Sequence, residues 1–210
     1  MACTAQVRYE SKANSRSPET NKKHSKMKVL ATDIPDVLII EPKLFGDQRG
    51  FFFETYQFDK YAASGISRPF VQDNLSRSAY GVIRGLHLQN PLAQGKLVSV
   101  VRGRVLDVAV DVRVGSPNFG RHVAVELNED NHRQLWVPRG FAHGFAVLSE
   151  TADFSYKCDN AYSSKDQIVV RWDDPAIAIR WGIENPSLSP RDAAAPCLAE
   201  VKNLPIYGQI

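Results

Sequence analysis

Apolar and polar residues alternate along much of the chain after its first 28 residues, and this period of two limits the possible folds more than any other feature. In the clearest segment, 104–112, Leu106 and Val108 fall on one side, whereas Asp107 and Asp111 fall on the other. Successive side chains of a β-strand point to opposite faces, so the alternation predicts a strand with one apolar face. Gly, Pro, Asn and Asp interrupt the pattern at about the length of a strand. Such spacing favours antiparallel meanders over strands that alternate with helices.

The same alternation of apolar and polar residues predicts strands elsewhere in the chain. Further strands are predicted at 37–41, 50–56, 96–101, 121–127, 134–137, 144–148, 152–158 and 168–172. One short helix is predicted at 57–64, where Gly65 would end it. The many prolines of the C-terminal third indicate packed loops and short helical turns. We therefore predict an all-β fold, a double-stranded β-helix or jelly-roll barrel with short peripheral helices.

The chain divides into a basic leader, residues 1–27, and a single domain, residues 28–210. Residues 1–28 hold seven Lys or Arg and two Glu, a net charge of +5, so the remainder carries −2 of the total +3. The leader has almost no large apolar side chains, so it cannot offset its chain entropy by burial and is predicted to be disordered. A nucleic-acid-binding arm and a natural start at Met27 are alternatives for this segment. The domain has no basic stripe that would indicate nucleic-acid binding.

Cysteine usage and hydropathy together predict a cytoplasmic protein. Cys3, Cys158 and Cys197 are far apart and form no CxxC pair, which is typical of free thiols in a reducing compartment. No apolar run approaches the ~18–20 residues that cross a bilayer. The N-terminus also lacks the pattern of a secretory signal. We therefore expect no membrane association.

Two histidines stand in motifs that depart from plain strand alternation. Segment 138–143 has the form Pro-x-Gly-x-x-His and resembles the second motif of the cupin superfamily, which makes the predicted barrel cupin-like. In metal-binding cupins the first motif supplies His-x-His and a Glu, whereas the corresponding stretch here reads His-Leu-Gln from His87. Zinc or iron needs at least three protein ligands in fixed geometry, so we predict no metal site. Taken alone, His87 and His143 could each be a hydrogen-bonded core or rim residue.

Eight short motifs add a more specific signal. They are EPK at 41–43, GDQRGFFFE at 46–54, VQDN at 71–74, RGLH at 84–87, QGK at 94–96, DVAVD at 107–111, PRGFAHGF at 138–145 and DAA at 192–194. In this order and spacing, they strongly resemble the dTDP-4-dehydrorhamnose 3,5-epimerase family. The resemblance runs from about Met27 to about Leu198 and leaves out the basic leader.

The resemblance implies an isomerase acting on dTDP-4-dehydro-6-deoxy-D-glucose, a nucleotide sugar with a ketone at C4. The protons on C3 and C5 lie beside that ketone, so removal of either gives an enolate, and a proton returned to the opposite face inverts the centre. Inversion at both carbons would give dTDP-4-dehydro-L-rhamnose. The reaction needs a base, a donor on the other face and a group that stabilises negative charge on O4. It requires no redox cofactor and no metal, so we expect none.

Four residues match the catalytic positions of the family. By similarity, His87 is the proton acceptor, a role that suits an imidazole near neutral pH. Asp192 would fix the tautomer of His87 and stabilise the imidazolium, although the two residues are far apart in sequence. Lys96 would stabilise the charge on O4, and Tyr156 would donate a proton from the opposite face. Without the family pattern, Tyr156 would be interpreted as a sheet residue and Lys96 as a strand-end charge.

The remaining matched positions would bind substrate. The planar fork of arginine suits a diphosphate, and an aromatic ring suits thymine as a stacking platform. Relatives commonly have an acidic residue where this chain has Gln167, and the neighbouring Asp166 could substitute. Asp107 could orient His143. The predicted substrate-binding residues are Arg49, Glu54, Gln72, Asn74, Arg84, His143, Tyr162 (against thymine), Arg191 (where relatives often have Lys) and Gln167.

The resemblance also implies a homodimer in which N-terminal strands are exchanged, since a long barrel edge benefits from such cover. No nucleic-acid partner is expected. Three other functions stay open: an epimerase that inverts only C3 or only C5, a non-catalytic cupin that binds a sugar nucleotide, and a metal-dependent cupin oxygenase or isomerase. The presence of all four catalytic positions argues against the non-catalytic alternative.

Overall fold

Two β-sheets account for most of the computed structural model, which describes residues 26–210. The predicted leader and Cys3 lie outside the described residues, apart from residues 26 and 27. The first sheet consists, in order, of β1 (Lys28–Ala31), β2 (Leu38–Glu41), β10 (Gln134–Val137), β7 (Lys96–Arg102), β12 (Thr151–Cys158) and β5 (Gln72–Ala79). The second consists of β13 (Gln167–Val169), β6 (Ile83–Gln89), β11 (Phe141–Val147), β8 (Arg104–Asp111) and β9 (His122–Asn128).

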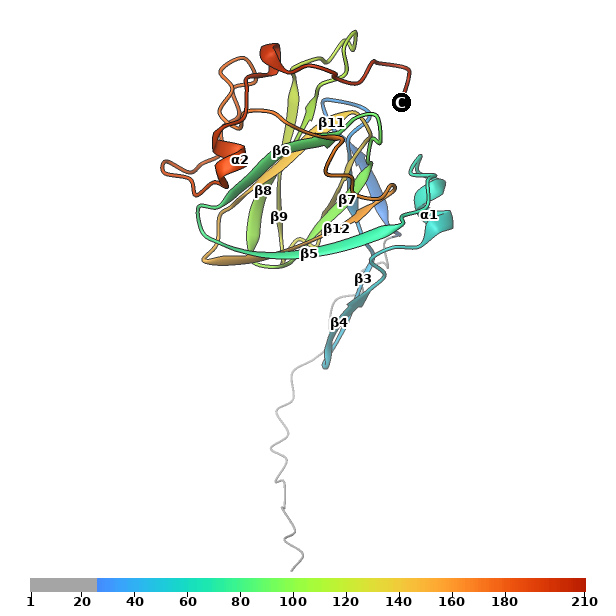
Figure 1. Ribbon diagram of the computed structural model, residues 1–210. Helices are drawn as coiled ribbons and strands as arrows, with labels where there is room; N and C mark the ends of the chain where they lie inside the picture. Colours follow the sequence, from blue (N-terminus) through green and yellow to red (C-terminus); the bar gives the residue numbers. More distant parts are fainter. Residues whose placement is uncertain (1–25) are drawn as a thin grey trace, which may run out of the picture.

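The two sheets face each other as the walls of a barrel (Figure 1). Between them lies an apolar core to which β7 contributes Val98, β12 contributes Phe154, and β11 contributes Phe141 and Phe145. Removal of these side chains from water is the main term that holds the sheets together. The predicted all-β jelly-roll fold is confirmed. Helices are limited to short peripheral turns: α1 (Phe58–Ala62), α2 (Pro190–Ala193) and a 3₁₀ turn (Leu198–Glu200).

Both faces of β8 are buried, but in different surroundings. Val108 and Val110 point away from the barrel and pack against the C-terminal segment in a cluster that includes Trp181. Asp107, on the other side of the strand, points into the barrel and contacts His143. The C-terminal segment thus provides a second apolar core, which allows the interior of the barrel to carry polar side chains.

Strands β5 and β6 escape the alternation pattern. The inward face of β5 is polar throughout, with Gln72, Asn74, Ser76 and Ser78, so it has no apolar side to identify it. β6 is buried on both faces along most of its length. The predicted strands are all present: β10 has the predicted ends, 134–137, whereas the ends of the others are shifted. β11 begins at Phe141, three residues before the predicted start, which brings His143 into the strand.

A separate hairpin of β3 (Leu44–Asp47) and β4 (Gly50–Phe53) projects from the barrel (Figure 1). The predicted strand 50–56 ends early, at Phe53, because the chain leaves the hairpin there. Phe51 and Phe52 on this hairpin are 61% and 68% exposed. A two-stranded hairpin is marginally stable alone in water, so exposed aromatic residues on it indicate a contact surface.

Cys158 and Cys197 are free thiols. Across residues 26–210, no helix has both the length and the apolar character needed to span a bilayer.

Candidate active site

A cavity with two lobes lies within the barrel. The larger lobe, about 420 Å³, is lined by Arg84, and the smaller, about 290 Å³, is lined by Tyr162. We call them the Arg84 lobe and the Tyr162 lobe. His87, Lys96 and Tyr156 line both lobes. These three side chains therefore lie where the lobes meet.

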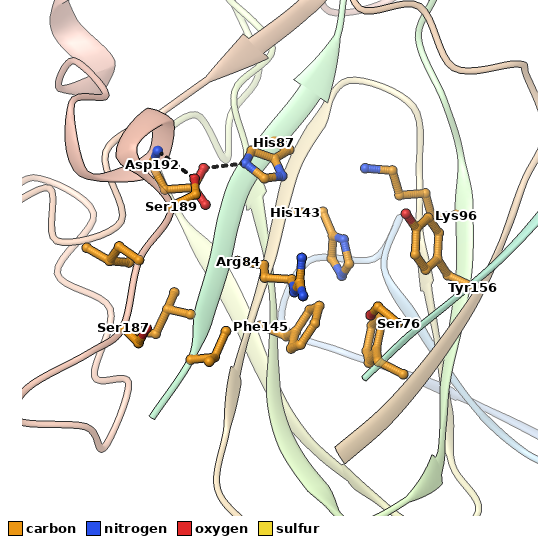
Figure 2. A pocket seen from close by; sticks show the side chains of 14 residues that line it. Ser76, Arg84, His87, Lys96, His143, Phe145, Tyr156, Ser187, Ser189 and Asp192 are labelled. Atoms are coloured by element: carbon orange, nitrogen blue, oxygen red, sulfur yellow. Dashed lines mark hydrogen bonds and ion pairs between the residues drawn. The ribbon is translucent and has the colours of Figure 1, made fainter. Parts of the chain in front are cut away.

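Helix α2 brings Asp192 against His87 (Figure 2). Ser189 begins the helix as its N-cap, where its Oγ accepts a hydrogen bond from the backbone N of Asp192 at 3.1 Å, and Pro190 follows at the first helical position. His87 Nε2 and Asp192 Oδ1 are 2.6 Å apart. The fold thus makes the contact that the sequence requires between residues 105 positions apart.

The Asp192 carboxyl group is held in its ionised form. Asp192 is only 3% exposed, and this burial opposes ionisation, but hydrogen bonds with His87 and Ser189 outweigh it and lower the pKa of Asp192 below its ordinary value. A carboxylate only accepts hydrogen bonds, so the proton between the two residues belongs to His87 Nε2. In a neutral imidazole, the other ring nitrogen, Nδ1, then keeps its lone pair.

Lys96 and Tyr156 come from two neighbouring strands and lie across the cavity from His87 (Figure 2). Lys96 begins β7 and is in register with Cys158 of β12, while Tyr156 lies two residues back on the same face of β12. Burial lowers the pKa of Lys96, although the nearby Cys158 and the Asp107 carboxylate oppose the shift. Burial also raises the pKa of Tyr156, which keeps its hydroxyl protonated at neutral pH.

A second histidine–aspartate pair adjoins the first. His143 Nε2 lies 3.0 Å from both carboxylate oxygens of Asp107, on the adjacent strand β8. In the register of β6 and β11, His143 pairs with His87. The structure therefore contains the contact through which we expected Asp107 to orient His143.

Two glycines explain how the two histidine-bearing strands approach so closely. A Cβ on Gly85 would lie 2.6 Å from Gly144 Cα and 2.8 Å from the His143 carbonyl oxygen, and a Cβ on Gly144 would lie 2.7 Å from the Arg84 carbonyl oxygen. Gly85 also has φ +128°, which L side chains rarely adopt. These positions account for the glycines in the RGLH and FAHGF motifs.

The Tyr162 lobe is lined by four of the nine predicted binding residues. Gln72, Asn74 and Gln167 line it with Tyr162. Gln72 Oε1 accepts a hydrogen bond from the Tyr162 backbone N at 2.9 Å, and the Tyr162 hydroxyl donates to Gln167 Oε1 at 2.9 Å. Arg191 also donates to Gln167 Oε1. Gln167 itself, rather than the neighbouring Asp166, therefore occupies this wall.

The two other predicted arginines, Arg84 and Arg49, lie in different places. Arg84 lines the lobe named after it, where its Nε donates to Ser78 Oγ at 3.0 Å. Arg49 is at the tip of the projecting hairpin, bound to Asp47, with its side chain 90% exposed. Glu54, just after the hairpin, pairs with Lys60 at 2.7 Å. Within a single chain, the structure does not bring Arg49 and Glu54 to the cavity.

Sequence reasoning missed several residues of the cavity wall. Phe145 and Phe154 line the Arg84 lobe as a stacked pair with ring centroids 4.1 Å apart. Phe154 is two positions before Tyr156 in β12, so alternation within that strand could have placed it on the same face. Ser189, which caps α2, is identifiable from the Ser-Pro pair that starts a helix.

In residues 26–210, no three His, Cys, Asp or Glu side chains are grouped to hold a metal ion.

Comparison with known proteins gives consistent matches. The sequence profile of the dTDP-4-dehydrorhamnose 3,5-epimerase family matches residues 31–200. The dTDP-4-dehydrorhamnose 3,5-epimerase of Shigella flexneri is 54% identical over 168 residues, which cover 79% of this chain and 93% of that protein. A crystal structure of dTDP-6-deoxy-D-glucose-3,5-epimerase from Legionella pneumophila Philadelphia 1, in complex with dTDP-4-keto-L-rhamnose, has a TM-score of 0.85 at 51% identity and covers 86% of this chain and 98% of that chain. A 3'-monoepimerase from Streptomyces bikiniensis, in complex with dTDP-quinovose, has a TM-score of 0.79 at 33% identity, covering 84% and 92%.

Proposed function

The chain belongs to the dTDP-4-dehydrorhamnose 3,5-epimerase family, and we propose that it inverts both C3 and C5 of dTDP-4-dehydro-6-deoxy-D-glucose to give dTDP-4-dehydro-L-rhamnose. One observation carries the proposal: the His87–Asp192 pair faces Lys96 and Tyr156 across the junction of the two lobes. A base, its carboxylate partner, a buried cation and a hydroxyl donor are the groups that an enolate mechanism needs.

His87 is the base in this proposal. Because Nε2 carries a proton toward Asp192, the lone pair of Nδ1 takes the proton from C3 or C5. The electron pair of the broken C–H bond forms the enolate double bond, and negative charge moves to O4. The ionised Asp192, whose pKa is lowered, stabilises the imidazolium that results.

Lys96 stabilises the charge on O4. Its Nζ makes no hydrogen bond or ion pair to any other residue within 26–210, so its ammonium is available to an oxygen in the cavity. A buried ammonium acts in a surrounding of low dielectric, where its attraction for an oxyanion is stronger than in water. This interaction grows as the enolate forms and therefore lowers the barrier to proton removal.

Tyr156 returns a proton to the opposite face of the sugar. Its O–H bond breaks as the new C–H bond forms, and the enolate electron pair returns to carbon while the C4 ketone is restored. The phenolate then takes a proton from solvent, and His87 releases its proton to solvent. Both groups are thereby ready for the second inversion.

The nucleotide is bound by the two lobes together. Tyr162 supplies a stacking surface for thymine, and Gln72, Asn74, Gln167 and Arg191 supply polar contacts around it. Arg84 suits the diphosphate, since its terminal guanidinium nitrogens are not used by the bond to Ser78. His143, held by Asp107, contacts the hexose.

Arg49 and Glu54 act, in this proposal, in the cavity of a second copy of the chain. The hairpin that precedes Glu54 projects from its own barrel, exposes Phe51 and Phe52, and carries Arg49 away from its own cavity. Exchange of hairpins between two protomers would bury these aromatic residues and add a cation to each site. We therefore propose a homodimer with exchanged N-terminal strands.

Incubation with dTDP-4-dehydro-6-deoxy-D-glucose in D₂O tests the reaction. Because both protons are exchanged with solvent groups, NMR of the product is expected to show deuterium at C3 and at C5. A coupled NADPH-dependent 4-ketoreductase should then yield dTDP-L-rhamnose. A product without deuterium at either carbon would refute the proposed epimerisation and favour the non-catalytic binding protein.

A single-centre epimerase is the second candidate, because a 3'-monoepimerase shares this fold over most of the chain. Deuterium at only C3 or only C5 in the same experiment would identify it. The sequence identity favours the double inversion, since the matches at 51% and 54% are both named 3,5-epimerases.

A further inference from the structure

The proposed reaction gives no role to two residues of the motifs around the site, Gly95 of QGK and Arg139 of PRGFAHGF. The structure connects them through Asp159, the residue that directly follows β12. The Asp159 side chain is only 1% exposed, and it lines neither lobe of the cavity. These contacts therefore act on the cavity from outside it.

Asp159 binds Gly95 through both its side chain and its backbone. Its Oδ1 accepts a hydrogen bond from Gly95 N at 2.7 Å, and its own N donates to Gly95 O at 3.1 Å. Arg139 holds the same carboxylate from the other side, with Nε 3.2 Å from Oδ1 and 3.0 Å from Oδ2. The start of β7, the end of β12 and the turn between β10 and β11 are thus joined at one point.

Gly95 directly precedes Lys96, which begins β7. Since Lys96 Nζ has no partner within residues 26–210, the backbone that carries it determines where the ammonium lies. Gly95 is confined on two sides: an added Cβ would overlap the Trp136 ring and lie 2.9 Å from Asp159 Oδ2. Only glycine permits this close approach.

We propose that Asp159 is a positioning residue, which clamps the start of β7 to the end of β12 and so sets where Lys96 stands relative to Tyr156. The inference rests on the proposed function, in which Lys96 stabilises the enolate. A loosened clamp lets the ammonium shift away from O4. Because that interaction forms in the transition state, kcat falls, whereas KM, which reports binding of the whole nucleotide, changes little.

Two substitutions at Asp159 separate the clamp from general stability. Asp159→Ala removes the acceptor for Gly95 N and is expected to lower kcat by about 10- to 100-fold with KM within about twofold of the parent. Asp159→Asn keeps an oxygen acceptor but removes the charge paired with Arg139. It is expected to lower Tm while kcat stays within about threefold of the parent, because the half-buried Arg139 loses its charged partner but Gly95 keeps its acceptor.

Asp153→Ala is the matched control. Asp153 lies toward the other end of β12, where it is paired with Arg77 at 2.6 Å and 2.7 Å, and it contacts neither lobe of the cavity. Loss of this ion pair is expected to leave kcat and KM at the parent's values, whatever it does to Tm.

Steady-state kinetics and thermal unfolding of the full chain decide the matter. An unchanged kcat in Asp159→Ala, or an equal loss of kcat in Asp159→Ala and Asp159→Asn, overturns the clamp while an active parent upholds the proposed function. If Asp159→Ala does not fold, Gly95→Ala takes its place: a lower kcat at constant KM supports the clamp, and a parental kcat overturns it. A parent that epimerises neither carbon refutes the proposed function, and the clamp with it.

Discussion

His87 and His143 stand directly opposite each other on the neighbouring strands β6 and β11, and each presents Nε2 to a different buried carboxylate. Two imidazoles that each contact a carboxyl group through Nε2 therefore share one wall of the cavity. They differ in access, since the side chain of His87 is 29% exposed and that of His143 is 8% exposed. His87 also lines both lobes, whereas His143 lines only one. This difference supports His87 as the base.

Substitution of the two histidines should give different results. His87→Ala is expected to lower kcat by about 10²- to 10⁴-fold, the range typical of a lost general base, and to stop deuterium exchange at C3 and C5. His143→Ala is expected to raise KM and still permit exchange. His122→Ala, on the edge strand β9, is the control and should behave as the parent. Exchange that survives in His87→Ala but not in His143→Ala would reverse the two roles.

The alkaline limit of kcat should report Lys96. Burial lowers the pKa of Lys96 below its ordinary 10.5, whereas burial raises the pKa of Tyr156 above its ordinary 10.0. As pH rises, loss of the ammonium proton removes the charge that stabilises O4, and kcat is expected to fall. The guanidinium of Lys96→Arg stays charged at all these pH values, so the fall in kcat should move to higher pH. At neutral pH, kcat of this variant is expected to be about 10- to 100-fold below the parent, because the guanidinium differs in shape from the ammonium and places its charge differently. An identical alkaline midpoint in both proteins would mean that another group titrates.

Asp192 should contribute to stability in a pH-dependent way. Its folded pKa lies below the unfolded value, because hydrogen bonds with His87 and Ser189 outweigh burial. Such a group stabilises the fold above its unfolded pKa, and the contribution is lost as pH falls through the folded pKa. Asp192→Asn is therefore expected to be about 1–3 kcal/mol less stable than the parent at neutral pH. Urea unfolding in acid should show this difference vanish; a difference that is constant with pH would contradict the assignment.

Mixed dimers can reveal whether the hairpin acts in a second copy. Arg49→Ala and His87→Ala should each be nearly inactive alone. After subunit exchange in an equal mixture, each mixed dimer has one site with both native residues, so about a quarter of the parental activity should return. The same mixture assayed before exchange is the control, and light scattering gives the oligomeric state. No recovery in verified mixed dimers would mean that Arg49 serves its own chain or none.

A buried hydroxyl outside the cavity offers a test of stability. Tyr56 OH has no hydrogen-bond partner among residues 26–210, while its ring packs against Tyr61 and Phe70. Tyr56→Phe keeps the ring but removes the unpaired hydroxyl. It is expected to raise the free energy of unfolding by about 1–3 kcal/mol and to leave kcat unchanged. Tyr61→Phe is the opposite case, because Tyr61 OH donates to Gln134 Oε1 at 2.6 Å, and it should destabilise. Chemical denaturation of both variants distinguishes the two effects.

Local pattern predicts much of this fold but not its assembly. Alternation identifies β8 because Val108 and Asp107 differ in polarity, and it misses β5 because that strand turns only polar residues inward. It also cannot tell that the apolar side of β8 faces the C-terminal layer, since both sides are buried. Only tertiary packing decides that question.

In the candidate site, too, the sequence indicates individual residues but not how the fold brings them together. Family motifs indicate His87 and Asp192, but their contact depends on where α2 docks against β6. Nothing in the sequence around Asp159 marks it, because its two partners belong to distant turns. The location of Arg49 also escapes local reasoning, since the hairpin carries it away from the cavity of its own chain.

The contact between Gly85 and Gly144 limits how this scaffold could be adapted to other sugars. A methyl group at either position would clash with the opposite strand, push β6 and β11 apart and so separate His87 from His143. Libraries for directed evolution should therefore hold both glycines constant and diversify Phe154, which lines the pocket from β12, outside that pair of strands.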